Sequence, residues 1–368
     1  MGKYLIVGAG LFGSTLANLL HSCGKDVTVV EKECAIGGTC RTERKCGIDI
    51  HLYGAHIFKT NDTWVWTYVN QIAEFKPFMN TPIAISYGEA FNLPINMNTF
   101  AKLWNAKFPS EAKDIINSQI PKDIDATLNL ENYAISKVGM EIYARFIKGY
   151  TEKQWNKPCS ELPPTILGRL PIRFEYNNNY YDTIYQGIPV CGYTELMNRM
   201  LAGTEVILDC DGKQFVKQYG DNYSHIIYTG MIDDFYDNVY GQLGYRSLRF
   251  NTVMKDCSNY QGNAVFNYVD AVVPYTRVIE HSHFLKQYGQ RTFVTYEYPA
   301  DYIPDRNTPY YPIPTQENEE LYEKYLQLSK DSGIIFSGRL GSYKYTDMAE
   351  TVRNAKTLFD KLIKEDKE

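Results

Sequence analysis

The glycines near the start of the chain have the spacing of a phosphate-binding turn. Residues 8–13 read GAGLFG and follow the apolar run Lys3–Val7. In a G-x-G-x-x-G pattern the first glycine makes a tight turn, the second lets backbone N–H groups approach a pyrophosphate, and the third lets a helix pack closely on a strand. The positive end of that helix would face the phosphates. The pattern is weak evidence alone, but its place between a strand and a helix predicts a bound dinucleotide.

An acidic residue and a second pair of glycines narrow the choice of dinucleotide. The next apolar run, Val27–Val30, ends at Glu31, which would accept hydrogen bonds from ribose hydroxyls and repel a 2′-phosphate. Gly37 and Gly38 follow shortly afterwards. Flavoproteins use such a pair to close the backbone over the FAD pyrophosphate, whereas an NAD site does not need it; the alternative is an ordinary glycine turn. The sequence therefore favours FAD.

Other residues of suitable chemical type occur in apolar or aromatic segments. His56 lies in YGAHIF (53–58), near the expected position of the isoalloxazine, although a buried structural histidine is the alternative. Arg169 and Arg277 stand in apolar segments that contain proline, where a guanidinium can bind phosphate with two hydrogen bonds. Tyr150 and Trp155 suit a nucleobase and a sugar, or the end of an amphipathic helix. The sequence contains no recognisable triad, carboxylate pair or metal-ligand cluster, so we expect no metal site.

The composition excludes several classes of protein. The 368 residues carry 38 basic and 43 acidic side chains, without the basic stripe that indicates nucleic-acid binding. No apolar stretch approaches the roughly 18 residues that cross a bilayer, and the chain opens directly into its first expected strand. The eight cysteines contain no C-x-x-C pair, so we expect them to be reduced. We therefore expect a cytoplasmic enzyme with neither nucleic-acid nor membrane partners.

The order of apolar patterns predicts an α/β fold with a discontinuous, Rossmann-like FAD-binding domain that is interrupted by a helical bundle and an antiparallel sheet. The domains that we expect are the FAD-binding domain (1–78, 190–240 and 332–368), the helical insert (97–157) and the antiparallel-sheet substrate domain (79–96, 158–189 and 241–331).

Helix signals are clearest in the insert and at the C-terminus. Asn98 or Thr99 is expected to cap the first helix of the insert, and apolar positions at helical spacing predict helical structure over 130–147. Asp347 is expected to cap the last helix of the chain.

Longer motifs make the chain recognisable. They are FNLPINMNTF (91–100), KGYTEKQW (148–155), RLPIRF (169–174), NNYYDTIYQGIP (178–189), PYTRVIEH (274–281) and GRLGSYKYTDM (338–348). With these motifs the chain resembles the bacterial UDP-galactopyranose mutases over essentially its whole length. The resemblance implies an intramolecular transferase that interconverts UDP-galactopyranose and UDP-galactofuranose without net redox change. In that chemistry N5 of reduced FAD displaces UDP and forms a flavin–sugar adduct. The resemblance further implies an external reductant such as NAD(P)H, a homodimer, and a supply of galactofuranose for cell-surface glycans.

The same resemblance assigns roles by motif position. Arg169 and Arg277 should bind the diphosphate, and His56 is the third catalytic candidate. Tyr150 should stack on uracil, and Trp155 should lie near the sugar. The full substrate site would comprise Asn80, Phe146, Tyr150, Thr151, Trp155, Arg169, Tyr180, Asn267, Arg277, Tyr310 and Tyr345. The cofactor site would comprise Gly8, Gly10, Phe12, Gly13, Glu31, Gly38, Thr39, His56, Ile57, Arg339, Asp347 and Met348.

Two positions depart from the family pattern. Thr39 stands where asparagine is common, and Lys59, directly after YGAHIF, stands where histidine or arginine is common. Lys59 would lie either near the sugar 2-position or on the surface, so acceptance of UDP-N-acetylgalactosamine stays open. The remaining alternatives are an amine-oxidase-like flavoprotein and a binding module with a vestigial FAD.

Overall fold

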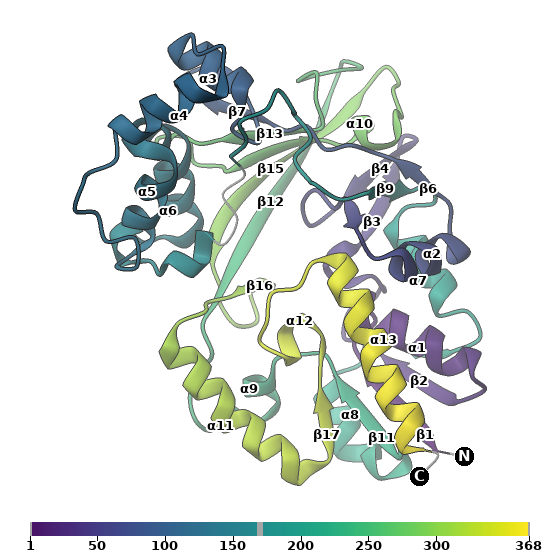
Figure 1. Cartoon of the computed structure of the whole chain (residues 1–368). Helices are drawn as coiled ribbons and strands as arrows, with labels where there is room; N and C mark the ends of the chain where they lie inside the picture. The colour runs from purple at the N-terminus through teal and green to yellow at the C-terminus, as the bar shows by residue number, and fades with distance from the viewer. Residues whose placement is uncertain (1, 168–171, 367–368) are drawn as a thin grey trace.

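The protein is represented by a computed structural model, which describes residues 2–167 and 172–366. Figure 1 shows a parallel sheet flanked by helices in the lower half and a helical bundle at the upper left. The long strands of a second sheet run between them. Among the described residues, no helix is both long and apolar enough to span a bilayer.

Within the described ranges the first sheet has five strands, all parallel. Their order is β10 (Glu205–Ile207), β2 (Asp26–Val30), β1 (Lys3–Val7), β11 (His225–Tyr228) and β17 (Ile334–Phe336). Both faces are covered, as a parallel sheet requires. Tyr4 and Ile6 pack with α1 (Leu11–Ser22) and α13 (Met348–Glu365). Leu5 and Val7 point to the other face, which α8 (Gly212–Tyr219), α9 (Ile232–Phe235) and α11 (Gln316–Ser332) cover.

The second sheet has seven strands in the described part of the chain. Their order is β16 (Pro309–Pro312), β12 (Tyr245–Lys255), β15 (Thr292–Asp301), β14 (Arg277–Glu280), β13 (Val265–Tyr268), β7 (Ile83–Ser86) and β8 (Glu89–Asn92). Its pairs are antiparallel, as expected, except that β13 and β7 are parallel. These two strands are separated in sequence by the whole helical insert, so no hairpin constrains their relative direction.

The helical insert contains α3 (Met97–Trp104), α4 (Pro109–Ser118), α5 (Leu130–Ile142), a π-helix (Tyr143–Lys148) and α6 (Gly149–Trp155). The helical structure predicted over 130–147 is confirmed, but it is not one regular α-helix. Gly139 interrupts it with φ 75° and ψ 168°, and the π-helical turns follow. The predicted cap of the first helix is wrong, because Asn96 caps α3 by accepting from the N–H of Asn98 at 2.9 Å. Thr99 instead accepts from the N–H of Asn96 at 3.4 Å.

Smaller elements join the two sheets. They are β3 (Thr42–Lys45) paired with β4 (Ile48–His51), the antiparallel set β5 (Phe58–Thr60), β9 (Tyr185–Pro189) and β6 (Phe75–Pro77), and the helices α2 (Thr63–Ile72), α7 (Tyr193–Met200), α10 (Ser282–Leu285) and α12 (Gly338–Gly341). Short 3-10 turns lie at Gly38–Cys40, Cys159–Glu161, Pro164–Leu167 and Gly220–Asn222. As predicted, Asp347 caps α13, accepting from the N–H of Glu350 at 2.9 Å.

Candidate active site

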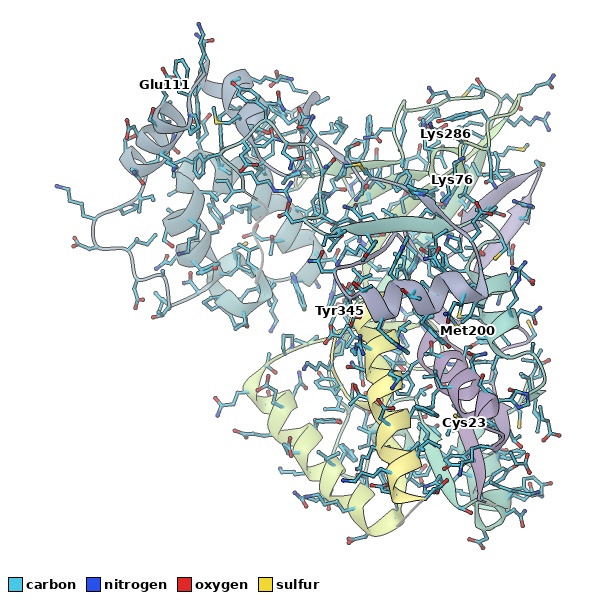
Figure 2. The ribbon with its side chains drawn as sticks, turned by 45° about the vertical axis from the view of Figure 1, so that its right-hand side comes forward. Cys23, Lys76, Glu111, Met200, Lys286 and Tyr345 are labelled. Atoms are coloured by element: carbon cyan, nitrogen blue, oxygen red, sulfur yellow. The ribbon has the colours of Figure 1, made fainter. Side chains whose placement is uncertain are left out.

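A cavity of about 880 Å³ lies at the carboxyl edge of the parallel sheet and extends to β14 and β15 of the second sheet. This edge is where open α/β sheets bind ligands. All twelve residues predicted for the cofactor site line this cavity, and so do Arg277, Tyr310 and Tyr345 from the predicted substrate site. Figure 2 shows Tyr345 beside the N-terminal end of α13.

The first glycine loop has a backbone that larger residues could not adopt. Gly8 has φ +110°, and a Cβ there would lie 2.0 Å from Oγ1 of Thr229. A Cβ on Gly13 would lie 2.0 Å from the carbonyl oxygen of Gly8. Neither clash can be relieved easily. At Gly13 the atom in the way is a backbone carbonyl oxygen, and at Gly8 it is the hydroxyl of Thr229, which already donates to the carbonyl of Val7 at 2.8 Å. The loop therefore requires glycine for the mechanical reasons that the sequence indicated.

The second glycine loop packs directly on the first. The N–H of Gly37 donates to the carbonyl of Ala9 at 2.9 Å, and a Cβ on Gly38 would lie 3.2 Å from Cα of Gly10. Gly10 also forms the N-cap of α1, and no described side chain caps that helix. The free N–H groups at the start of α1 consequently face the cavity, which is the arrangement that accepts a pyrophosphate.

Glu31 is positioned by the same loops. It is buried, with Oε2 accepting from the N–H of Ala9 at 2.7 Å and Oε1 from the N–H of Glu33 at 3.0 Å. Each carboxylate oxygen keeps a further lone pair for a ribose hydroxyl. The residues at this end of the cavity therefore fit the adenosine diphosphate half of FAD.

His56 lines the cavity as a neutral ring. Burial lowers the pKa of His56 to about 4, and the nearby Arg339 and Arg277 also disfavour its charge. Its Nδ1 lies 2.9 Å from the carbonyl oxygen of Gly54, which can only accept. Nδ1 therefore carries the hydrogen, and Nε2 is the acceptor of the ring.

Two further histidines, His51 and His281, form a chain of hydrogen bonds that ends at the backbone N–H of His56. His51 accepts at Nδ1 from the N–H of His56 at 3.1 Å, and His281 accepts at Nδ1 from the N–H of His51 at 3.2 Å. The Nε2 of His281 donates to Oγ1 of Thr295 at 2.7 Å. Burial lowers the pKa of His281 to about 3 and moves that of His51 well below its usual value. Both rings thus serve as neutral acceptors for backbone N–H groups.

Arg277 is held by the carboxylate of Glu297, which is not among the predicted site residues. It faces Glu297 across β14 and β15, and its Nε donates to Oε1 of Glu297 at 2.9 Å. Glu297 is 1% exposed, and its Oε2 has no hydrogen-bond partner among the described residues. Burial opposes the charge of Arg277, but Glu297, Tyr150 and Tyr311 together outweigh this effect, and the pKa of Arg277 is raised well above its usual value. The available signal was an acid within the apolar, tyrosine-rich segment 293–298.

Two predicted substrate tyrosines lie close to Arg277. Burial raises the pKa of Tyr150 to about 12, and Arg277 opposes this shift. Burial also raises the pKa of Tyr180, again against an opposing effect of Arg277. Asn267 is paired with Arg277 in the β13–β14 register, and its buried Oδ1 has no partner among the described residues. An acceptor and two phenols are thus brought close to the guanidinium of Arg277, which is the one of these four residues that lines the cavity.

Among the described residues, the remaining predicted substrate residues also lie outside the lining of the cavity. Phe146 is buried in the core of the helical bundle, where its ring lies 5.1 Å from that of Phe91. Trp155 packs against the same core, and Thr151 and Asn80 are buried. Arg169 lies outside the described residues.

The two positions that depart from the family pattern have definite partners. Oγ1 of Thr39 accepts from Arg339 at 3.0 Å. Lys59 lines the cavity, where its Nζ lies 2.7 Å from Oδ2 of Asp347 and 4.9 Å from the centre of the Tyr181 ring. Its side chain is 19% exposed, so the interpretation of Lys59 as a surface residue is wrong.

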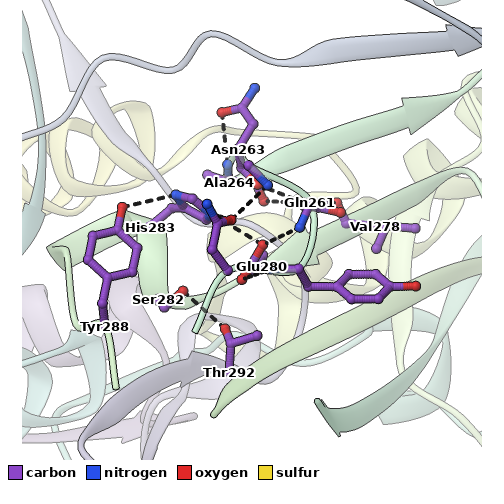
Figure 3. Close-up of polar contacts among 12 residues, drawn as sticks. Gln261, Asn263, Ala264, Val278, Glu280, Ser282, His283, Tyr288 and Thr292 are labelled. Carbon is purple, nitrogen blue, oxygen red and sulfur yellow. Dashed lines mark hydrogen bonds and ion pairs between the residues drawn. The ribbon is translucent and has the colours of Figure 1, made fainter. Parts of the chain in front are cut away.

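Figure 3 shows a second polar cluster, around Glu280. The carboxylate of Glu280 accepts from the N–H groups of Tyr260 and Gln261, both at 2.8 Å, and lies 3.2 Å from Nε2 of His283. Tyr288 bonds to the other nitrogen of His283 at 3.1 Å. Because both oxygens of Glu280 have partners, we interpret this cluster as a structural tie between the 259–264 loop and β14.

The chain matches known proteins over its full length. A family model described as UDP-galactopyranose mutase matches residues 145–345, and one described as an NAD(P)-binding Rossmann-like domain matches residues 6–72. The chain is 38% identical over 366 residues to a probable UDP-galactopyranose mutase from Klebsiella pneumoniae, covering 98% of this chain and 94% of the relative. It is 35% identical over 377 residues to a dTDP-fucopyranose mutase from Escherichia coli, covering 100% of both.

Solved structures agree on the fold. A crystal structure of a reduced UDP-galactopyranose mutase matches with a TM-score of 0.79 at 13% identity, covering 99% of this chain and 96% of that chain. A putrescine oxidase matches with a TM-score of 0.58 at 14% identity, covering 98% and 99%. At such identities the likeness concerns the fold alone. The family model, however, spans more than half of the sequence, and the relatives align from end to end. The chain belongs to the UDP-galactopyranose mutase family of isomerases.

Proposed function

We propose that this enzyme interconverts UDP-galactopyranose and UDP-galactofuranose with FAD as its cofactor in the reduced state. The observation that carries the proposal is the single cavity with two chemically different ends. One end is lined by the two glycine loops, the start of α1 and Glu31. The other is lined by Arg277, and Tyr150 and Tyr180 lie close to Arg277 without lining the cavity themselves. The first end suits the adenosine diphosphate half of FAD, and the second suits a nucleoside diphosphate.

A reduced flavin bound in this cavity would supply a nucleophile, namely the electron pair of N5, for attack on the anomeric carbon of the sugar. Arg277 would bind the diphosphate as the bond from the anomeric carbon to UDP breaks, and would hold UDP until it returns. Tyr310 is buried with its hydroxyl unpartnered among the described residues, so it can donate to the same phosphate oxygens. His56, neutral and with Nε2 as acceptor, would stay uncharged beside the isoalloxazine.

The second candidate differs in its nucleotide and sugar but not in its chemistry. A relative that aligns over the full length of both chains carries the name dTDP-fucopyranose mutase. Thymidine lacks the ribose 2′-hydroxyl and adds a methyl group at the base, and fucose lacks the 6-hydroxyl. The residues around Tyr150 and Asn267 would bind either base. UDP-N-acetylgalactosamine stays a third substrate to test, because Lys59 lines the cavity.

The wider biological setting belongs to the same proposal. We infer an external reductant such as NAD(P)H, a homodimeric enzyme and a cytoplasmic location, with the product supplying galactofuranose for cell-surface glycans. The family resemblance supports each of these.

A substrate panel tests the proposal directly. The FAD-loaded protein, reduced with dithionite, is incubated separately with UDP-galactose, dTDP-fucose and UDP-N-acetylgalactosamine, and the products are resolved by chromatography. We expect UDP-galactofuranose from UDP-galactose, no oxygen consumption and no turnover with oxidised flavin. Preferential turnover of dTDP-fucose would select the second candidate. Equal rates with and without reductant would rule out the nucleophilic role of the flavin.

A further inference from the structure

Lys153 makes an uncommon set of contacts. From α6 its Nζ donates to four backbone carbonyls of the segment 268–276, which we call the carbonyl loop and which joins β13 to β14. The distances are 2.8 Å to Tyr268, 2.9 Å to Asp270, 3.0 Å to Val273 and 3.2 Å to Tyr275. An ammonium group has three hydrogens, so these four acceptors share them and leave none for solvent.

Gly149, one turn earlier on α6, touches the same loop. A Cβ on Gly149 would lie 2.5 Å from the carbonyl oxygen of Val269 and 2.9 Å from the nitrogen of Ala271. Positions i and i+4 share one face of a helix. The face of α6 that carries Gly149 and Lys153 therefore rests directly on the backbone of the carbonyl loop.

The two elements joined in this way carry different halves of the proposed nucleotide site. Helix α6 carries Tyr150, between Gly149 and Lys153 in sequence, whereas the loop leads into β14 at Arg277. Tyr150 and Arg277 are close enough for the charge of one to shift the pKa of the other. The loop is also tied at its far side, where Asp270 accepts from the N–H of Tyr87 at 2.7 Å.

Burying the ammonium group of Lys153 costs desolvation free energy, and an uncharged side chain could fill the same space without that cost. Burial lowers the pKa of Lys153 to about 8, against an opposing effect of Asp270. A methionine of similar length could fill the same space without desolvating an ammonium. We therefore infer that the role of the Lys153 ammonium is to donate hydrogen bonds to the four carbonyl groups of the carbonyl loop.

We propose that Lys153 is a positioning residue that fixes the separation between Tyr150 and Arg277 and so sets the affinity for the nucleoside diphosphate. This inference rests on the proposed function, because it takes the space beside these residues as the site for UDP. When one ligand binds two elements at once, its affinity depends on the spacing between them. The affinity of a fragment that binds only one element does not depend on that spacing.

The test compares Lys153→Met with Lys157→Met, a matched control that removes the same charge from an exposed position four residues further on. Dissociation constants for UDP, uridine and inorganic pyrophosphate are measured by calorimetry on the FAD-loaded proteins. In Lys153→Met we expect UDP to bind roughly 10-fold more weakly or worse. Uridine and pyrophosphate should change by less than about 2-fold, because each needs only one of the two elements. The flavin spectrum and all affinities of Lys157→Met should stay as in the wild type.

Two further variants keep the proposal testable if Lys153→Met folds poorly. Gly149→Ala leaves the lysine in place but pushes α6 off the loop, and it should weaken UDP selectively in the same way. Lys153→Ala should regain UDP affinity with added n-propylammonium, which restores the missing atoms and the charge, but not with n-propanol. If the wild type binds UDP and these variants bind it equally well, or lose uridine and pyrophosphate in the same proportion, the positioning role is refuted. A wild type that does not bind UDP would instead count against the proposed function.

Discussion

At the scale of single residues, Arg277 and Glu297 form an ion pair, so the effect of changing one depends on the presence of the other. The carboxylate is almost fully buried and its only charged partner among the described contacts is the guanidinium of Arg277. Removing one partner from a buried pair leaves the other uncompensated, which costs roughly 3–5 kcal/mol. A loss of activity on changing Arg277 therefore mixes lost phosphate binding with lost stability unless the acid is changed as well.

This pairing gives a two-step prediction. Arg277→Ala should keep its flavin but lose turnover by at least ~10²-fold, because charge-assisted hydrogen bonds to the diphosphate are worth roughly 1.5–3 kcal/mol each. Its melting temperature should also fall. Arg277→Ala combined with Glu297→Gln should recover the melting temperature but not the turnover. Recovery of turnover in the double variant would mean that Arg277 matters only for stability.

Lys59 yields a prediction about substrate preference. It lines the cavity and pairs with Asp347, the cap of α13, so its ammonium is held near the place proposed for the flavin and sugar. Lys59→His should change the ratio of turnover on UDP-N-acetylgalactosamine to that on UDP-galactose, because one polar contact near the sugar is worth roughly 1 kcal/mol. Competition between both substrates in one vessel measures this ratio directly. An unchanged ratio would place Lys59 outside contact with the sugar.

At the scale of elements, the sequence was most informative where one local rule decides the outcome. The strand–glycine–helix–strand unit at residues 3–30 was predicted correctly because its glycines, apolar runs and acid are contiguous. The cap at Asp347 was likewise readable from its immediate neighbours. The break at Gly139 was missed because apolar positions keep a helical spacing on both sides of it, and one glycine does not show which φ it adopts.

Features that depend on distant segments could not be read in this way. The parallel pairing of β13 with β7 joins residues on either side of the helical insert. The partnership of Glu297 with Arg277 depends on the β14–β15 register. The contact of Lys153 with four carbonyls needs α6 to lie on a loop more than a hundred residues later. The residues predicted for the cofactor site, by contrast, were identified from motif positions alone, and all twelve line the cavity.

The glycine loops provide a prediction at this scale. Gly13→Ala places a methyl group against the carbonyl of Gly8, a contact with no flexible end to move. We expect the variant to be purified without bound flavin, because α1 must shift away from the turn that we propose accepts the pyrophosphate. Gly289→Ala is the matched control, since its added Cβ would meet nothing nearer than 4.0 Å. The ratio of flavin absorbance to protein absorbance gives the answer, and normal flavin content in Gly13→Ala would contradict the geometry of the loop.

At the scale of the whole molecule, buried neutral histidines link the cofactor side to the second sheet. His51 ends β4 and His281 follows β14, so the hydrogen bond between them joins two elements behind the His56 segment. Both rings pack on Phe284 of α10. The neighbouring carboxylate of Glu280, the last residue of β14, raises the pKa of His281, but burial lowers it by more. Protonating these rings would remove acceptors that backbone N–H groups need.

The pH dependence of stability should therefore reveal these rings. An unfolded histidine takes up a proton near pH 6.5, whereas folded His281 does so only near pH 3. Between these values the unfolded state binds the extra proton, so stability is present above pH 6.5 and is lost as the pH falls. From pH 6.5 to pH 5 this amounts to about 2 kcal/mol for one such residue. His281→Gln keeps an acceptor for the N–H of His51 but does not titrate. Its urea midpoint should fall less between pH 7 and pH 5 than that of the wild type, while His21→Gln, at an exposed position on α1, should behave as the wild type does. Equal losses in all three proteins would show that His281 is not the group that destabilises the fold in acid.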